Sequence, residues 1–245
     1  MEKTHAAIRA LLNKLSEVPH TETLANPYAT ERPDLDRLGG AAIRRRNCEM
    51  YLQKLAARGV KLIILGEAAG YQGCRFSGIA FTSEHTLANH PFFKDGGFER
   101  SGIRERLFRE PSGSIVWETI ERLPHIPVLW NIVPFHPHTA DKPLSNRTPT
   151  RPERELGKQF LLELMEILGQ PQIAAAGRIS SETLTQLVSS TPPCATRRMA
   201  ARPNSKPASR HSKLAERFTN WRAIDRPARL NCKSAATPAA VLRAG

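Results

Sequence analysis

A short apolar run that ends at a glycine constrains the fold of this chain more than any other feature. Residues 61–65 read K-L-I-I-L, and Gly66 stops the run, with Gly70, Gly73 and Gly78 close behind. A run this short, bounded by glycine, predicts a buried strand rather than a helix. The later glycines allow tight turns and let a ligand approach bare backbone N–H groups. Because ligands bind beyond the carboxyl ends of the strands in open α/β sheets, the loop after this run is the predicted binding site.

The rest of the chain alternates helical and strand patterns. Helices are predicted at residues 5–18, 34–58, 117–123, 152–168 and 180–187, and further strands at 128–133 and 173–176, while residues 85–100 look irregular. On the helix at 34–58 the inward side chains are predicted to be Leu38, Ile43, Tyr51 and Leu55. Strands that alternate with helices indicate a parallel sheet covered on both faces. We therefore predict an α/β fold, a three-layer αβα sandwich around a short parallel sheet, in a domain of residues 1–189 whose N-terminal helices occupy 1–58.

The positive charge is concentrated in the last part of the chain. The net charge is +13, but residues 194–245 hold 12 Lys and Arg against 2 acids, whereas residues 1–193 hold 24 against 21. Residues 190–245 are also rich in Ala, Arg, Pro and Ser and show no sustained period, which predicts a basic, disordered tail. The charge therefore says little about the partner of the globular part.

Several classes of protein are disfavoured. No run of 18 apolar residues would span a membrane, and the N-terminus has no secretory signal, so a cytoplasmic location is expected. The four cysteines are widely spaced, which favours reduced thiols over disulfides or a metal site. The glycine loop lacks both G-x-G-x-x-G and the Walker pattern, which disfavours a nucleotide-binding α/β protein.

Two groups of titratable side chains are expected at the surface. Arg44, Arg45 and Arg46 on the helix predicted at 34–58 are interpreted as a solvated face. His136 and His138 flank a proline after the second strand and are interpreted as surface loop residues without a catalytic role.

Three segments of the chain, in order, resemble the uracil-DNA glycosylase superfamily. G-E-A-A-G-Y-Q-G-C-R-F-S-G-I-A-F-T-S resembles its first motif, W-N-I-V-P-F-H-P its asparagine-bearing second strand, and A-A-A-G-R-I-S-S-E-T-L the strand–helix step before its last motif. The resemblance covers roughly residues 40–190. It implies a monomeric enzyme that hydrolyses the N-glycosidic bond of uracil, or another deaminated base, flipped out of DNA. It implies no metal and no cofactor.

The resemblance also implies roles for particular residues. The backbone N–H groups of a turn from Gly66 to Ala68 would donate to O2 of the leaving base. Phe81 would stack on the base, and Asn131 would hydrogen-bond its edge, since an amide offers both donor and acceptor. Glu67 is the candidate for orienting the attacking water. Ala68 stands where the best-known branch has an aspartate, so no direct general base is supplied at that position.

Each assignment has a structural alternative. Glu67 would cap the following turn, Phe81 would belong to the core, and Asn131 would be a turn residue at a strand end. For Arg75, a contact to a DNA phosphate and an ion pair that holds the loop both fit, with the ion pair slightly favoured.

The last motif of the superfamily, an H-P-x-x-G-G-like loop, is missing after the helix predicted at 180–187. GC-rich codons for residues 194–205, read from the third base of the first codon, would spell R-H-P-P-D-G-G-P-A-K-L, which contains it. We hypothesise that the chain is out of frame from a point near residues 189–193, so that activity is strongly reduced or absent. The alternative to a glycosylase is a non-catalytic nucleic-acid-binding α/β protein.

Overall fold

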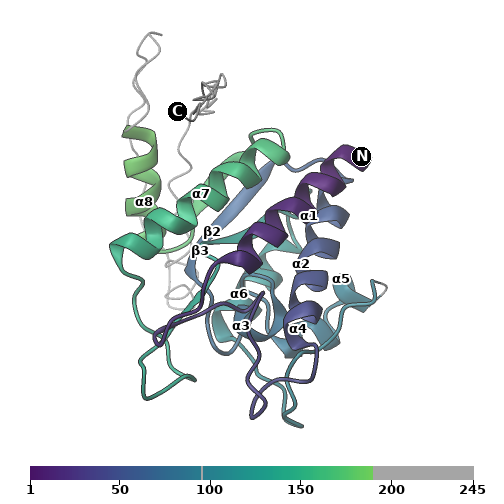
Figure 1. Ribbon diagram of the computed structural model, residues 1–245. Helices are drawn as coiled ribbons and strands as arrows, with labels where there is room; N and C mark the ends of the chain where they lie inside the picture. Colours follow the sequence, from purple (N-terminus) through teal and green to yellow (C-terminus); the bar gives the residue numbers. More distant parts are fainter. Residues whose placement is uncertain (95, 190–245) are drawn as a thin grey trace, which may run out of the picture.

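The computed structural model describes residues 1–94 and 96–189, in which helices surround a small sheet (Figure 1). The strands are β1 (Leu24–Ala25), β2 (Leu62–Ala68), β3 (Val128–Val133), β4 (His136–Pro137) and β5 (Gln172–Ala175). The helices are α1 (Glu2–Glu17), α2 (Gly40–Ala56), α3 (Cys74–Ser77), α4 (Glu84–Asn89), α5 (Pro91–Lys94), α6 (Pro111–Ile120), α7 (Arg151–Ile167) and α8 (Arg178–Ser189). The predicted tail and the missing last motif lie outside the described residues.

The central sheet is parallel and has the strand order β3-β2-β5. Ile63 of β2 lies opposite Val128 of β3, and every residue of β3 is buried, as expected for an apolar strand inside a parallel sheet. Pairing of β2 with β3 continues to Ala68, whereas pairing with β5 ends at Leu65. The predicted α/β class, a short parallel sheet flanked by helices, is confirmed.

Local sequence sets the start of α7. The Thr150 side chain accepts the Glu153 N–H, and the Glu153 carboxylate accepts the Thr150 N–H, which together form a capping box. Pro152 occupies the first turn, where its missing N–H costs nothing. Further along, Gly157 allows the helix backbone to lie directly on the carbonyl of Ile132 in β3. Helix α7 thus covers the sheet, with α1 packed beside it (Figure 1).

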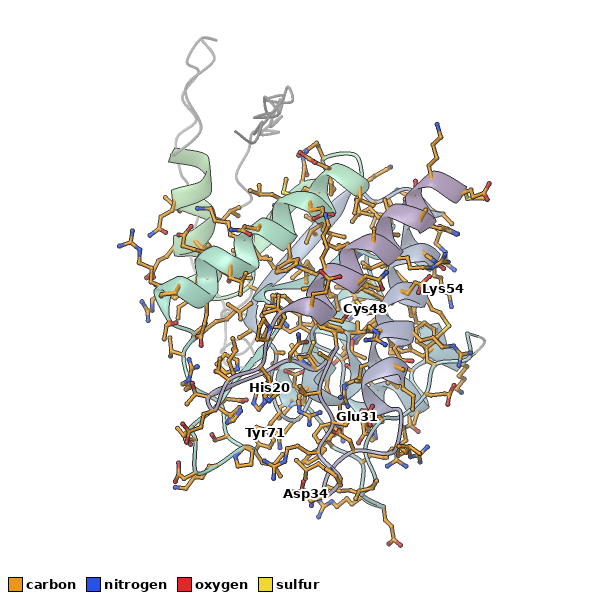
Figure 2. The ribbon with its side chains drawn as sticks, viewed as in Figure 1. His20, Glu31, Asp34, Cys48, Lys54 and Tyr71 are labelled. Atoms are coloured by element: carbon orange, nitrogen blue, oxygen red, sulfur yellow. The ribbon has the colours of Figure 1, made fainter. Side chains whose placement is uncertain are left out.

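The helix predicted at 34–58 begins only at Gly40, so the predicted start was wrong. The carboxylate of Glu31, in the preceding loop (Figure 2), accepts the backbone N–H groups of Gly39 at 3.2 Å and Ala41 at 3.0 Å. It thereby caps donors that the first turn leaves unpaired. Leu38, predicted to face inward, lies before the helix and is 99% exposed.

The remainder of α2 follows the predicted face with one exception. Tyr51 and Leu55 are buried and Ile43 is half-buried. Arg46 is exposed, but Arg44, predicted to be solvated, is completely buried. A buried guanidinium requires charged and hydrogen-bonding partners, and these belong to the loop described below.

Other elements differ from the sequence prediction in extent. Residues 85–100, predicted to be irregular, contain most of α4 and all of α5. Helix α6 begins at Pro111 rather than residue 117, since proline suits a first helical position. The antiparallel pair of β1 and β4 was not predicted, because two residues per strand are too few to show alternation.

Neither a membrane span nor a metal cluster is found in residues 1–94 and 96–189. No helix there is long and apolar enough to cross a membrane. No group of three or more His, Cys, Asp and Glu side chains there is placed to hold a metal ion. Cys48, labelled on α2 in Figure 2, and Cys74 are buried free thiols.

Candidate active site

Three of the residues singled out in the sequence converge at the carboxyl end of the sheet. Gly66 of β2 lies in register with Asn131 of β3. A Cβ atom on Gly66 would stand 2.5 Å from Asn131 Oδ1 and 2.6 Å from the Phe81 ring. Glycine is therefore required sterically, because any side chain would displace the amide or the ring. Asn131 is only 4% exposed, so its amide faces the protein interior and not bulk water.

Phe81 has an unusual backbone conformation. Its φ is +54°, in the left-handed region that bulky side chains rarely adopt. Its carbonyl oxygen lies against Gly113 of α6, at a place where a Cβ atom could not be accommodated. The half-buried ring is held over Gly66 by this strained turn. Residues in sparsely populated conformations are concentrated at functional sites, where the surrounding structure imposes the strain.

The segment from Gly66 to Ala68 is the end of strand β2, not the turn expected from the sequence. It pairs with β3 on one side, but the pairing with β5 stops at Leu65. Beyond Leu65, no strand among the described residues pairs with β2 on the β5 side. An unpaired strand end of this kind can present N–H groups to a ligand.

Glu67 lies on the other face of β2 from Gly66, because side chains alternate along a strand. Burial raises the pKa of its carboxyl group, while Arg178 and Arg154 act to lower it. These two arginines belong to the helices α8 and α7. Although it borders the same hollow as Ala68, the structure does not bring it into the group formed by Gly66, Phe81 and Asn131.

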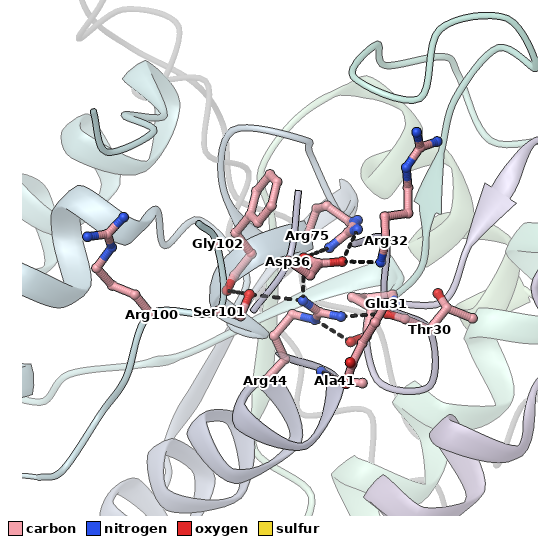
Figure 3. Close-up of polar contacts among 12 residues, drawn as sticks. Thr30, Glu31, Arg32, Asp36, Ala41, Arg44, Arg75, Arg100, Ser101 and Gly102 are labelled. Carbon is pink, nitrogen blue, oxygen red and sulfur yellow. Dashed lines mark hydrogen bonds and ion pairs between the residues drawn. The ribbon is translucent and has the colours of Figure 1, made fainter. Parts of the chain in front are cut away.

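Arg75 belongs to a buried ion-pair network that holds the glycine loop (Figure 3). It is 3% exposed, and its two terminal nitrogens donate to Asp36 Oδ1 at 3.0 Å and Oδ2 at 2.8 Å. Arg44 Nη1 donates to the same carboxylate at 2.9 Å and to Ser101 Oγ at 2.9 Å. Burial acts to raise the pKa of Asp36, but the hydrogen bonds from Arg75 and the two positive charges hold it below its ordinary value. This geometry supports the ion-pair interpretation of Arg75 over a DNA phosphate contact.

The two histidines predicted to be surface loop residues are buried, and that prediction was wrong. His136 is 0% and His138 7% exposed, and their ring centroids lie 5.3 Å apart. His136 Nε2 is 2.8 Å from the Ser145 carbonyl oxygen. Burial lowers the pKa of His136 to about 4, so the ring is neutral at pH 7. The strand pairing of β4 with β1 accounts for the error, since it draws this segment into the fold.

A hollow of about 190 Å³ opens beside the end of β2. Its wall includes Ala68, Gly70, Glu110, Asn146 and Arg147. The last three were missed by sequence reasoning. Asn146 Oδ1 accepts the Tyr71 N–H at 3.1 Å, which ties the hollow's wall to the glycine loop. The run S-N-R-T-P-T before α7 was the available signal, because it combines an amide and a base directly before a helix cap.

Glu110 immediately precedes α6 and directs its carboxylate into the glycine loop. A Cβ atom on Gly70 would be 3.4 Å from Glu110 Oε1, and side chains at Gly73 or Gly113 would collide with the carboxylate. Oε2 is buried and has no hydrogen-bond partner among the residues that the structure describes. Burial raises the pKa of Glu110 to about 7, and a hydrogen bond with Ser112 opposes this rise.

A second, basic hollow adjoins the glycine loop. It measures about 520 Å³ and includes Gln72, His85, Arg104, Arg106 and Arg109 in its wall. The guanidinium of Arg104 lies 4.7 Å from the centre of the Phe108 ring. Three arginines around one concavity favour negatively charged ligands.

Comparisons with known proteins support the fold. No protein-family model matches the sequence, and no curated protein matches it significantly. Among solved structures, the chain is similar to the crystal structure of wild-type SMUG2 from Pedobacter heparinus, with a TM-score of 0.53 and 14% sequence identity. The match covers 76% of this chain and 81% of that chain. At this identity the likeness concerns the fold alone, and it agrees with the α/β class of the described part of the chain.

Proposed function

We propose that this chain has the base pocket of a uracil-type DNA glycosylase, which hydrolyses the N-glycosidic bond of a flipped deaminated base in DNA. The observation that carries the proposal is the convergence of Gly66, Phe81 and Asn131 at the carboxyl end of the sheet. An aromatic face, an amide and bare backbone are what the recognition of a planar, hydrogen-bonding base requires. The likeness in fold to SMUG2 agrees with this assignment.

The proposed binding mode follows from the contacts around Gly66. The Phe81 ring lies against Gly66, so the ring has to shift outward for a base to enter between them. The base then stacks on Phe81, while the Asn131 amide hydrogen-bonds its edge. A side chain at Gly66 would fill the space between the Phe81 ring and the Asn131 amide.

The proposed reaction is hydrolysis without a metal or cofactor. Water attacks C1′ of the sugar, the bond between C1′ and the base breaks, and its electron pair leaves with the base. The backbone N–H groups of the segment from Gly66 to Ala68, where pairing with β5 has ended, stabilise the negative charge that develops at O2. Glu67, at the border of the hollow, orients the water.

The basic hollow favours a second candidate, a nucleic-acid-binding protein without catalysis. Arg104, Arg106 and Arg109 would contact phosphates in either case. Binding of this kind falls steeply with salt and shows no preference for uracil. The two candidates therefore differ in the release of a base.

The proposal includes the hypothesis that the chain is out of frame near residues 189–193 and so lacks the last motif. Sequencing the gene across codons 185–200 tests the frame directly. An oligonucleotide with one uracil, incubated with the chain and then with alkali, breaks wherever a base has been removed. We expect strong cleavage by a version with the tail restored to the other frame and much weaker cleavage by the present chain. Absence of cleavage by the restored version, with uracil, hypoxanthine or xanthine in single- or double-stranded DNA, would overturn the proposal.

A further inference from the structure

Glu110 is a half-buried acid with a buried carboxylate oxygen, and the described residues supply no counter-charge for it. Its Oε2 atom has no hydrogen-bond partner among the described residues. The other buried carboxylate beside the glycine loop, that of Asp36, is held by Arg75 and Arg44. Burying a carboxylate without a counter-charge is costly, so its retention next to a hollow suggests a functional use.

The surroundings of Glu110 are shaped around its carboxylate. Gly73 and Gly113 leave the space that the two oxygens occupy, and Gly70 lies beside Oε1. Gly113 also carries the contact to the Phe81 carbonyl. Gly113, three residues after Glu110, thus contacts the strained Phe81, and Glu110 borders the hollow at the end of β2.

We propose that Glu110 is a catalytic carboxylate that faces C1′ of the flipped nucleotide, stabilises the positive charge that develops on the sugar, and takes a proton from the attacking water. The proposal rests on the proposed function. The oxygen of water forms a bond to C1′, and the bond from C1′ to the base breaks with its electron pair on the base. One proton of the water moves to Glu110, which leaves a neutral carboxylic acid, an abasic sugar and the anion of the base.

Glu110 is better suited to accept a proton than Glu67. Burial raises the pKa of Glu67 as well, but the charges of Arg178 and Arg154 oppose that rise. Among the described residues no arginine has a comparable effect on Glu110, and its raised pKa is consistent with a base that is half ionised near neutral pH. Both acids border the hollow of about 190 Å³, which is large enough to hold a water.

The charged and titratable groups around Glu110 come from several elements. Glu67 of β2 and Arg147 of the segment before α7 border the same hollow, and the Cys74 thiol of α3 is electrostatically coupled to Glu110. Arg147 is paired with Glu153, at 2.6 Å from Oε1 and 2.9 Å from Oε2. Its charge is thus already balanced, and Glu110 remains the acid without a partner cation.

A binding experiment tests this role even if the present chain turns over slowly. Two oligonucleotides are compared, one with a cationic pyrrolidine in place of the abasic sugar and one with a neutral tetrahydrofuran. A carboxylate near C1′ should favour the cation, which mimics the charge of the transition state. At pH 8 we expect the full chain to bind the pyrrolidine at least about tenfold more tightly, as for close charge pairs across an interface.

The variant Glu110→Gln should lose this preference and keep its affinity for the tetrahydrofuran. Glu118→Gln, on the same helix and 71% exposed at its side chain, should keep the preference. A preference retained in Glu110→Gln would overturn the role of Glu110 and leave the proposed function standing. If the unmodified chain preferred neither abasic analogue to undamaged DNA, the proposed function itself would fail.

The unmodified chain provides a second measurement should the variant not fold. The ratio of the two affinities should rise between pH 6 and pH 8 as Glu110 ionises, while the pyrrolidine stays charged. A ratio that does not change over this range would overturn the proposal without any substitution.

Discussion

Replacing Glu110 by glutamine should change how the stability of the protein depends on pH. The fold raises the pKa of Glu110 from 4.5 to about 7 because burial disfavours the charged form. The folded state therefore holds a proton that the unfolded state releases between these two values. Stability from this group is complete below pH 4.5 and is lost as pH rises through 7. The whole loss amounts to about 3 kcal/mol, at 1.36 kcal/mol for each pH unit between the two pKa values.

The pH dependence of the unmodified chain alone does not isolate this effect. His136 has its pKa lowered from 6.5 to about 4 by burial, so its contribution grows with pH through nearly the same range. The two contributions oppose each other. The informative quantity is the difference in unfolding free energy between Glu110→Gln and the unmodified chain, in which His136 cancels.

Urea unfolding followed by tryptophan fluorescence, at pH values from 4.5 to 8, gives this difference. It should grow by about 3 kcal/mol in favour of Glu110→Gln across the range. Glu118→Gln, which changes an exposed acid on the same helix, should show no such growth. A difference for Glu110→Gln that stays constant within roughly 1 kcal/mol would refute the claim that the carboxylate of Glu110 is buried without a counter-charge.

The other predictions concern the loop and the pocket. Asp36→Ala leaves the buried guanidinium groups without their carboxylate and should lower the unfolding free energy by about 3–5 kcal/mol. Asp34→Ala breaks an exposed ion pair and should change the unfolding free energy little. Equal effects of the two substitutions in urea unfolding would contradict the buried network. Gly66→Ala places a methyl group 2.5 Å from Asn131 Oδ1 and 2.6 Å from the Phe81 ring. It should lower the unfolding free energy by roughly 1–3 kcal/mol and weaken the binding of uracil-containing DNA. An unchanged affinity of the variant for this DNA would disprove the prediction. In the frame-restored version, Asn131→Ala should slow base release by about a hundredfold, while the circular dichroism spectrum shows that the fold is intact. An unchanged rate of base release would show that Asn131 does not contact the base.

The sheet was predictable because its signals are local. Each signal lies within a few residues of the element it predicts. Examples are the apolar runs of β2 and β3 and the proline and glycine at the two ends of α7. Gly66 and Asn131 could be linked through their positions at neighbouring strand ends, since parallel strands end at the same edge of the sheet. These features need no knowledge of long-range contacts.

The parts that were not predicted depend on contacts far apart in the sequence. Arg44 looked like a surface residue within a basic run, but Asp36 and Ser101 bind it in the interior. His136 looked like a loop residue, but pairing of its strand with β1 buries it. Glu110 carried no motif at all; only the fold shows that its carboxylate meets the glycine loop.

The most direct test of the proposed function is to detect the free base. A uracil-containing oligonucleotide is incubated with the frame-restored version, and the small-molecule fraction is analysed by mass spectrometry. The proposal predicts stoichiometric release of uracil, or of hypoxanthine or xanthine from the matching oligonucleotides, with far less release by the present chain. Tight, salt-sensitive binding of these oligonucleotides with no free base from any of them would contradict it and favour the non-catalytic alternative.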